Sequence, residues 1–121
     1  MNDHTKKLLF DVLESGRSIQ SWCEHRTFAE YENDRQLRRA VEREFEIIGE
    51  ALNRLLRLDG TTAANISQLS SIVGFRNRII HGYDTVDDAT VWGIIGRHLP
   101  QLLAEVERLL QEPDTDMHGL S

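Results

Sequence analysis

Apolar residues recur at helical spacing along almost the whole chain, and this pattern constrains the fold more than any other feature. In four segments, residues 8–23, 37–58, 66–80 and 92–110, apolar side chains stand three or four positions apart, as on the buried face of an amphipathic helix. The 121 residues include only two prolines, and a chain of this length suits one core. We therefore expect one all-α domain over residues 1–112, an antiparallel bundle of four or at most five helices, and a flexible tail over residues 113–121.

Polar residues at the edges of these segments predict where the helices begin and end. The expected N-cap residues are Asp3 for the first helix, Asn33 or Asp34 for the second, and Thr85 for the fourth, with Asp87 and Asp88 in its first turn. Gly82 is expected to end the third helix, because glycine adopts the left-handed conformation at little cost. Pro100 lies within the pattern of the fourth helix and lacks a backbone donor, so we expect a kink there.

The second helix is the longest and carries two apolar stripes. The first consists of Leu37, Val41, Phe45, Ile48, Leu52 and Leu55, and the second of Ala40, Ile47, Ala51 and Leu58. A helix that is apolar over a wide arc must be covered on more than one side. We expect one stripe to face the bundle and the other to face a second copy of the chain.

Charge and cysteine content exclude several classes of protein. The net charge of −6 argues against a protein that binds nucleic acid through overall positive charge, and DNA binding is not expected. Cys23 is the sole cysteine, so it predicts a small core residue in a reducing compartment and not a disulfide framework. No apolar run approaches the ~20 residues that span a bilayer, and residues 1–7 do not resemble a signal sequence. A cytoplasmic location is expected.

Residues 76–84 concentrate polar chemistry in an otherwise apolar helical segment. Arg76, Asn77 and His81 lie within six positions of one another. An arginine can bind a phosphate through two hydrogen bonds, an asparagine can orient a ligand, and a histidine titrates near neutral pH. These groups are the minimum set for cleaving a phosphodiester bond without a metal.

Helical geometry restricts how these side chains can meet. Asn77 and His81 share a face, whereas Arg76 and His81 point about 140° apart on a straight helix. The two could still converge if the helix ends at His81, if the Arg76 side chain swings round, or if a second subunit supplies a matching set. We favour the third arrangement, a cleft lined by two copies of Arg76, Asn77 and His81.

Several blocks of the sequence resemble the HepT-like ribonuclease toxins, a branch of the HEPN superfamily of helical bundles. Residues 76–83 resemble the R-x-x-x-x-H-x-Y motif of that family, and residues 48–51 resemble its I-G-E-A block. Residues 91–92 and 99–100 resemble the V-W and L-P positions of its last helix. The blocks occur in the family's order and span most of the chain.

The resemblance implies an all-helical homodimer with a metal-independent RNA-cleaving cleft. In that mechanism the ribose 2′-hydroxyl attacks the adjacent phosphorus and leaves a 2′,3′-cyclic phosphate and a 5′-hydroxyl. His81 would transfer the proton, Arg76 would hold the phosphate, and Asn77 would orient His81 or the substrate. The resemblance also implies a type VII-like toxin–antitoxin system, in which a minimal nucleotidyltransferase antitoxin attaches AMP to Tyr83 and blocks the cleft.

Other readings of these residues remain open. Arg76 and His81 could bind backbone carbonyls at the end of the helix, where cations suit the helix dipole. Glu50 could form a solvated pair with Arg54, or it could face the motif helix and pair with Arg76 or Arg78. The expected residues of the site are therefore Arg76, Asn77 and His81, with Tyr83 as the modified residue and Glu50 and Arg78 in support.

Two further groups of residues are candidates for binding RNA or a metal ion. Arg35, Arg38, Arg39 and Arg43 line one face of the second helix, with Glu42, Glu44 and Glu46 between them. This pattern is typical of a salt-bridged surface, and RNA contact is the alternative. Five histidines occur without the H-x-x-x-H or H-E-x-x-H spacing, so neither a metal nor a cofactor is expected.

A function from another class fits the same residues. The chain could be a noncatalytic helical module that binds a nucleotidyltransferase and presents nucleotide or substrate to it. The acidic net charge fits this alternative slightly better than it fits a ribonuclease. The first expectation remains the RNA-cleaving toxin.

Overall fold

The computed structural model describes residues 1–81 and 86–113 of the chain. Over these residues it contains helices and no strands, so the all-α class expected from the apolar spacing is confirmed. The helices are α1 (Asp3–Cys23), α2 (Phe28–Glu32), α3 (Arg35–Leu58), α4 (Gly60–Ala63), α5 (Leu69–His81), α6 (Asp88–Arg97) and α7 (Leu99–Gln111).

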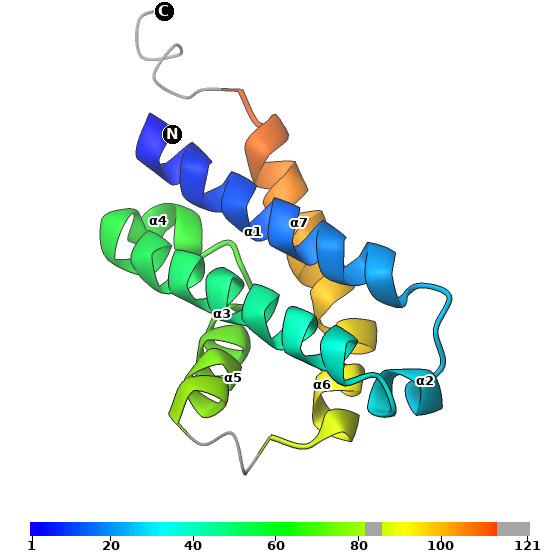
Figure 1. Cartoon of the computed structure of the whole chain (residues 1–121). Coiled ribbons are helices and arrows are strands. Elements are labelled where there is room, and N and C mark those ends of the chain that lie inside the picture. Colours follow the sequence, from blue (N-terminus) through cyan, green and yellow to red (C-terminus); the bar gives the residue numbers. More distant parts are fainter. Residues whose placement is uncertain (82–85, 114–121) are drawn as a thin grey trace, which may run out of the picture.

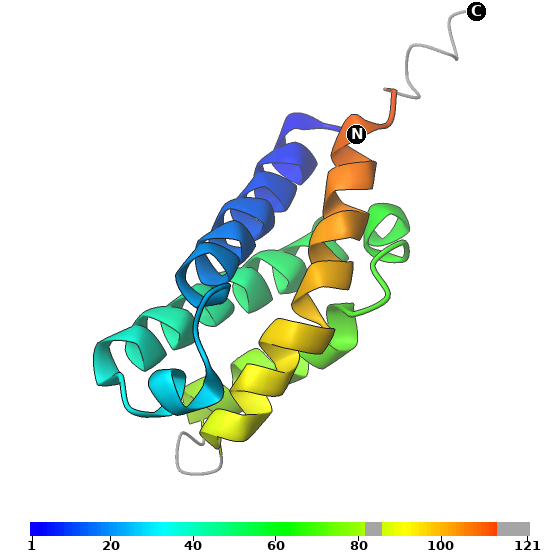
Figure 2. The same ribbon diagram turned by 90° about the vertical axis from the view of Figure 1, so that its right-hand side faces the viewer.

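Helices α1 and α3 run antiparallel and form the centre of the bundle (Figure 1). Helix α7 packs against α1, and α5 packs against α3. Figure 2 shows α6 and α7 as one column alongside α1, with the start of α1 and the end of α7 at the same end of the molecule. Because α5 has α3 as its main neighbour, the polar motif on α5 is positioned chiefly by α3.

Asparagine and aspartate side chains cap α1, α3 and α6, in two cases one or two residues from the expected place. Asn2, not Asp3, caps α1, since its side chain accepts a hydrogen bond from the Thr5 amide at 2.8 Å. Asp34 caps α3 through the Leu37 amide at 3.0 Å, which decides between the two candidates there. Asp87 is the cap of α6 and not a first-turn residue. The expected cap Thr85 and the expected helix stop Gly82 lie outside the described residues.

The fourth predicted helix is divided in two, and this corrects the expected kink. The His98 amide donates to the Ile94 carbonyl and closes α6, and the Leu102 amide donates to the His98 carbonyl and opens α7. Pro100 therefore stands in the first turn of α7. A proline is tolerated there because amides of the first turn have no partner within the helix. The chain ends one helix and starts another instead of bending a continuous one.

The connection between the first two long helices is itself a short helix. Thr27 and Glu30 form a capping box at the start of α2. The Tyr31 ring is fully buried, with its centroid 5.3 Å from that of Trp92, and the Phe28 ring lies 6.3 Å from the Trp92 ring. These aromatic contacts join α2 to α6.

The two stripes of α3 have different surroundings. All six residues of the first stripe are buried in the core. In the second stripe Ala51 is buried, Ala40 and Ile47 are half-buried, and Leu58 is exposed. Helix α5 therefore covers only part of the second stripe within one chain.

On α1, Cys23 is buried as expected, and burial raises the pKa of its thiol. Trp22, in contrast, is an exposed residue, although its spacing placed it on the apolar face. Among the helices of residues 1–81 and 86–113, none is long and apolar enough to cross a membrane.

Candidate functional site

Arg76 is held by helix α3. Its Nη2 atom lies 2.8 Å from the Glu50 Oε2 atom, and its Nη1 atom donates to the Asn77 Oδ1 atom at 3.1 Å. The other carboxylate oxygen of Glu50 accepts from Arg54 Nε at 2.9 Å. Glu50 therefore bridges two guanidinium groups, and both pairings considered for it from the sequence, with Arg54 and with the motif helix, occur together.

This bridge carries an excess of positive charge. One carboxylate, Glu50, faces the two cations Arg54 and Arg76. The Arg76 side chain is 21% exposed, so solvent screens it less than it screens a fully exposed arginine. Such a guanidinium is fixed in direction and still has N–H groups to offer an anion.

Gly49 makes the approach of Arg76 to α3 possible. A Cβ atom added at Gly49 would lie 2.3 Å from the Arg76 Cβ atom and 2.5 Å from its Cγ atom. Any side chain at this position would push α5 away from α3. In the sequence this glycine stood out only as part of the I-G-E-A block, and its packing role was not predicted. A glycine inside a long helix, directly before the glutamate of the bridge, was the available signal.

One nitrogen of Arg76 has no partner. Its Nε atom is buried and donates no hydrogen bond within the described part of the chain. A buried N–H without a partner costs free energy. The rest of the guanidinium borders a surface groove of about 280 Å³, which Leu8, Ile47, Ala51 and Ile80 also line.

The remaining motif residues lie on the surface at the end of α5. Asn77, Arg78 and His81 are exposed. Among the described residues, no hydrogen bond joins His81 to Arg76 or to Asn77, whose Oδ1 atom faces Arg76 instead. His81 is also absent from the lining of the groove that Arg76 borders. Tyr83, the expected modified residue, lies outside the described residues.

Arg78 lies near the start of the next helix, where its charge acts on Asp87. Hydrogen bonds from the Thr90 amide and hydroxyl to the Asp87 carboxylate lower the pKa of Asp87, and the charge of Arg78 lowers it further. Arg78 thus acts on the cap of α6, across the segment that follows the motif.

The arginine-rich face of α3 is salt-bridged, as the interleaved glutamates predicted. Arg39 pairs with Glu42 at 3.2 Å and Arg43 pairs with Glu46 at 3.1 Å. Over residues 1–81 and 86–113, no group of three or more His, Cys, Asp or Glu side chains is arranged to hold a metal ion.

Comparison with known proteins finds related sequences over most of the chain. The family model described as "Ribonuclease HepT-like" matches residues 12–109. "Putative RNase MJ1380" of Methanocaldococcus jannaschii is 33% identical over 102 residues, which cover 84% of this chain and 93% of that protein. "Putative RNase MJ1216" of the same organism is 28% identical over 107 residues, or 88% of each chain.

A relative from another organism extends the similarity. "Putative RNase TTE0752" of Caldanaerobacter subterraneus subsp. tengcongensis is 31% identical over 86 residues, covering 71% of this chain and 76% of that protein. No solved structure matches the chain. The family model spans α3, α5 and α6, and so includes Glu50, Arg76 and His81. The chain therefore belongs to the family of HepT-like ribonucleases.

Proposed function

We propose that the chain is a metal-independent endoribonuclease toxin of a type VII-like toxin–antitoxin system, and that it acts as a homodimer. The observation that carries the proposal is the anchored Arg76. Glu50 and Gly49 fix its guanidinium at the edge of a groove, and His81 lies exposed at the end of the same helix. Family membership supplies the class of reaction.

In the proposed reaction the 2′-oxygen of ribose forms a bond to phosphorus as the bond from phosphorus to the 5′-oxygen breaks. A His81 imidazole accepts the 2′-hydroxyl proton, and a proton is returned to the departing 5′-oxygen. Arg76 binds the phosphate and stabilises the charge that develops on it. The products are a 2′,3′-cyclic phosphate and a 5′-hydroxyl.

A second copy of the chain is needed to complete this site. Arg76 is turned toward α3, and no described contact links it to His81. Ile80 is 42% exposed and lines the groove beside Arg76, together with half-buried Ile47. These apolar side chains support docking of a second protomer at this face, so that Arg76 of one protomer acts with His81 of the other.

The direct test is RNA cleavage in the presence of a chelator. Arg76→Ala and His81→Ala should each abolish cleavage while the helical content is retained, and Arg108→Gln, an exposed cation outside the groove, should have no effect. Products of the wild type should carry 2′,3′-cyclic phosphate ends. Cleavage by either purified alanine variant would refute the role of that residue.

Mixing the two inactive variants tests the shared site. If Arg76 and His81 act from different protomers, a heterodimer of Arg76→Ala and His81→Ala contains one intact pair and regains part of the activity. Activity that stays absent, with subunit exchange verified by native mass spectrometry, would contradict that arrangement.

We further propose that a nucleotidyltransferase partner transfers AMP to Tyr83. A bulky charged group two residues from His81 would obstruct the cleft and repel RNA phosphates. Intact-mass spectrometry after incubation with such a partner and ATP should show an AMP adduct that Tyr83→Phe lacks. The same adduct on Tyr83→Phe would exclude this site.

One observation favours a noncatalytic function. The pairing of Arg76 with Glu50 neutralises part of the charge that would otherwise bind phosphate. A module that only presents substrate to a nucleotidyltransferase would bind RNA or nucleotide without cutting it. This second function would be supported if the RNA stays intact in the cleavage assay while its electrophoretic mobility changes when the chain is added.

A further inference from the structure

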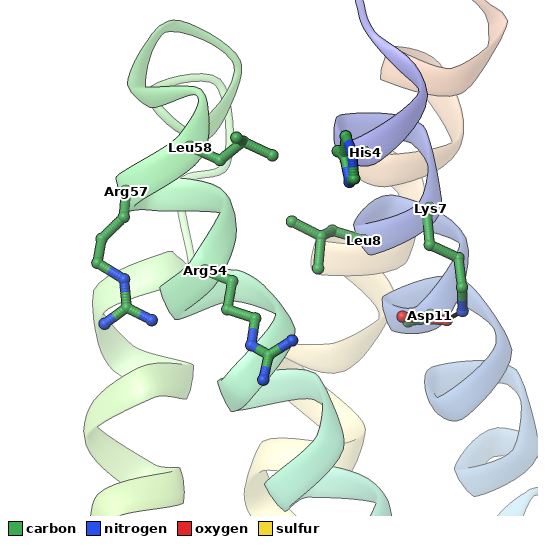
Figure 3. A pocket seen from close by; sticks show the side chains of 7 residues that line it. All are labelled: His4, Lys7, Leu8, Asp11, Arg54, Arg57 and Leu58. Carbon is green, nitrogen blue, oxygen red and sulfur yellow. Dashed lines mark hydrogen bonds and ion pairs between the residues drawn. The ribbon is translucent and has the colours of Figure 1, made fainter.

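A wide groove between α1 and α3 lies beside the candidate site. It has a volume of about 770 Å³ and is lined by His4, Lys7, Leu8, Asp11, Arg54, Arg57 and Leu58 (Figure 3). Leu8, Asp11 and Arg54 also line the smaller groove that contains Arg76. The two hollows therefore share part of their lining, and we call the wider one the α1–α3 groove.

Positive charge predominates in the α1–α3 groove. Lys7, Arg54 and Arg57 line it against the single carboxylate of Asp11, although the whole chain carries a net charge of −6. Lys7 pairs with Asp11 at 2.5 Å. Arg57 is exposed and forms no ion pair within the described residues. The local excess of positive charge is thus a property of the wider groove, since the cations and carboxylates that line the smaller hollow are equal in number.

The cations of the groove are accessible. The side chains of Lys7 and Arg54 are 72% and 63% exposed. In Figure 3, Leu8 and Leu58 extend between the two helices and leave an apolar strip near the charged groups. An exposed set of lysine and arginine side chains suits the phosphates of a flexible polyanion.

We propose that the α1–α3 groove binds the phosphates of single-stranded RNA that flank the scissile phosphate. This inference rests on the proposed function, since it extends the substrate path from Arg76. Arg54 links the two parts, because it lines both hollows and shares Glu50 with Arg76. A strand whose scissile phosphate lies at Arg76 would pass Arg54 first and then reach Lys7 and Arg57.

The charge distribution favours RNA over a protein partner for this groove. A protein–protein interface is depleted of charged residues at its core, whereas charged side chains make up most of the lining here. Affinity that depends on phosphate contacts has a measurable signature, because each contact releases counterions. For single strands, each contact adds about 0.7 to the magnitude of the slope of log K against log salt.

The test measures binding apart from cleavage. A fluorescent single-stranded RNA, long enough to span both hollows, is titrated with the His81→Ala chain at several salt concentrations. Adding Lys7→Gln and Arg57→Gln together should weaken binding about tenfold and reduce the slope of log K against log salt by about 1.4. Adding Arg108→Gln instead, an exposed cation outside the groove, should change neither quantity.

A substitution that removes a negative charge, and not a positive one, controls for damage to the fold. Asp11→Asn removes the one carboxylate of the groove and releases Lys7. It should therefore strengthen RNA binding and increase the salt slope. A misfolded surface would not bind more tightly.

Two results would overturn the proposal. One is an unchanged salt slope in the Lys7→Gln, Arg57→Gln chain. The other is a changed sedimentation coefficient with unchanged RNA affinity, which would make the groove a contact between copies. Because binding is measured in a variant that does not need to cleave, a wild-type chain without nuclease activity would refute the proposed function and leave this test valid.

Discussion

Replacing Gly49 by alanine should separate the effect of helix propensity from that of helix packing. Alanine is favoured over glycine in a helix interior by about 1 kcal/mol. At Gly49, however, the new methyl carbon would lie 2.3 Å from the Arg76 Cβ atom, whereas an ordinary contact needs 3.4 Å or more. Relief therefore requires a displacement of about 1 Å, and the atom in the way is fixed to the backbone of α5.

The net magnitude follows from these two opposing terms. Overpacking a well-filled site costs about 1–3 kcal/mol, and a clash with a Cβ atom belongs at the upper end because no rotamer change relieves it. After subtraction of the gain in propensity, Gly49→Ala should lower the free energy of unfolding by about 2 kcal/mol. RNA cleavage should fall as well, because the displacement moves Arg76 relative to Glu50.

Two other glycines provide matched controls. Gly74 in α5 has open space where a Cβ atom would stand, so Gly74→Ala should raise the free energy of unfolding by about 0.5–1 kcal/mol. At Gly16 a Cβ atom would meet the flexible end of the Leu103 side chain at 2.4 Å, so Gly16→Ala should be less damaging than Gly49→Ala.

The assay is urea denaturation followed by far-ultraviolet circular dichroism, repeated at several protein concentrations because a dimer gains stability with concentration. If Gly49→Ala is as stable as the wild type and cleaves RNA normally, the close contact of α3 and α5 is not what positions Arg76.

Three further predictions concern single side chains. Tyr31→Phe should raise the free energy of unfolding by up to about 1 kcal/mol, because the buried Tyr31 hydroxyl has no hydrogen-bond partner among the described residues; a clear loss of stability in urea denaturation would mean that the hydroxyl is satisfied. Hydrogen bonds from the Thr62 hydroxyl and amide lower the pKa of Asp59 below its ordinary value of 3.8. The contribution of Asp59 to the free energy of unfolding is therefore full above pH 3.8, and it is lost as the pH falls through the lower pKa of the folded state. Asp59→Asn should therefore be less stable than the wild type at neutral pH but converge with it in acid, and parallel stability curves against pH would contradict this. Glu50→Gln should change stability by less than about 1 kcal/mol, since the bridge is partly exposed, yet lower the rate of RNA cleavage about tenfold by releasing Arg76; unchanged kinetics would remove Glu50 from the site.

Local chemistry explains which elements could be predicted. Apolar spacing located the four helical segments, because an amphipathic helix repeats its buried positions whatever it packs against. The N-cap residues were harder to predict from the sequence. Asn2 and Asp3 are equally good capping residues, and it is Asn2 that accepts the hydrogen bond from the Thr5 amide. The division at His98 was missed because Pro100 is compatible either with a kinked helix or with the first turn of a new one.

The site shows the same limit. Residue types alone made Arg76, Asn77 and His81 candidates for the site. They left Glu50 between two partners, because one helix cannot reveal which neighbour it faces. The bridge from Arg54 to Arg76 appeared only when α5 was placed on α3. The role of Gly49 was equally hidden, since the atoms that would collide with its missing side chain lie 27 positions further along the chain.

The order of residues was thus sufficient for the helical class, the position of the polar motif and the family to which the chain belongs, because these depend on periodicity and on short motifs. Only the tertiary structure decided which carboxylate holds Arg76 and which glycine lets it approach. Such contacts join helices that are distant in sequence, and their distances depend on how side chains interlock between helices.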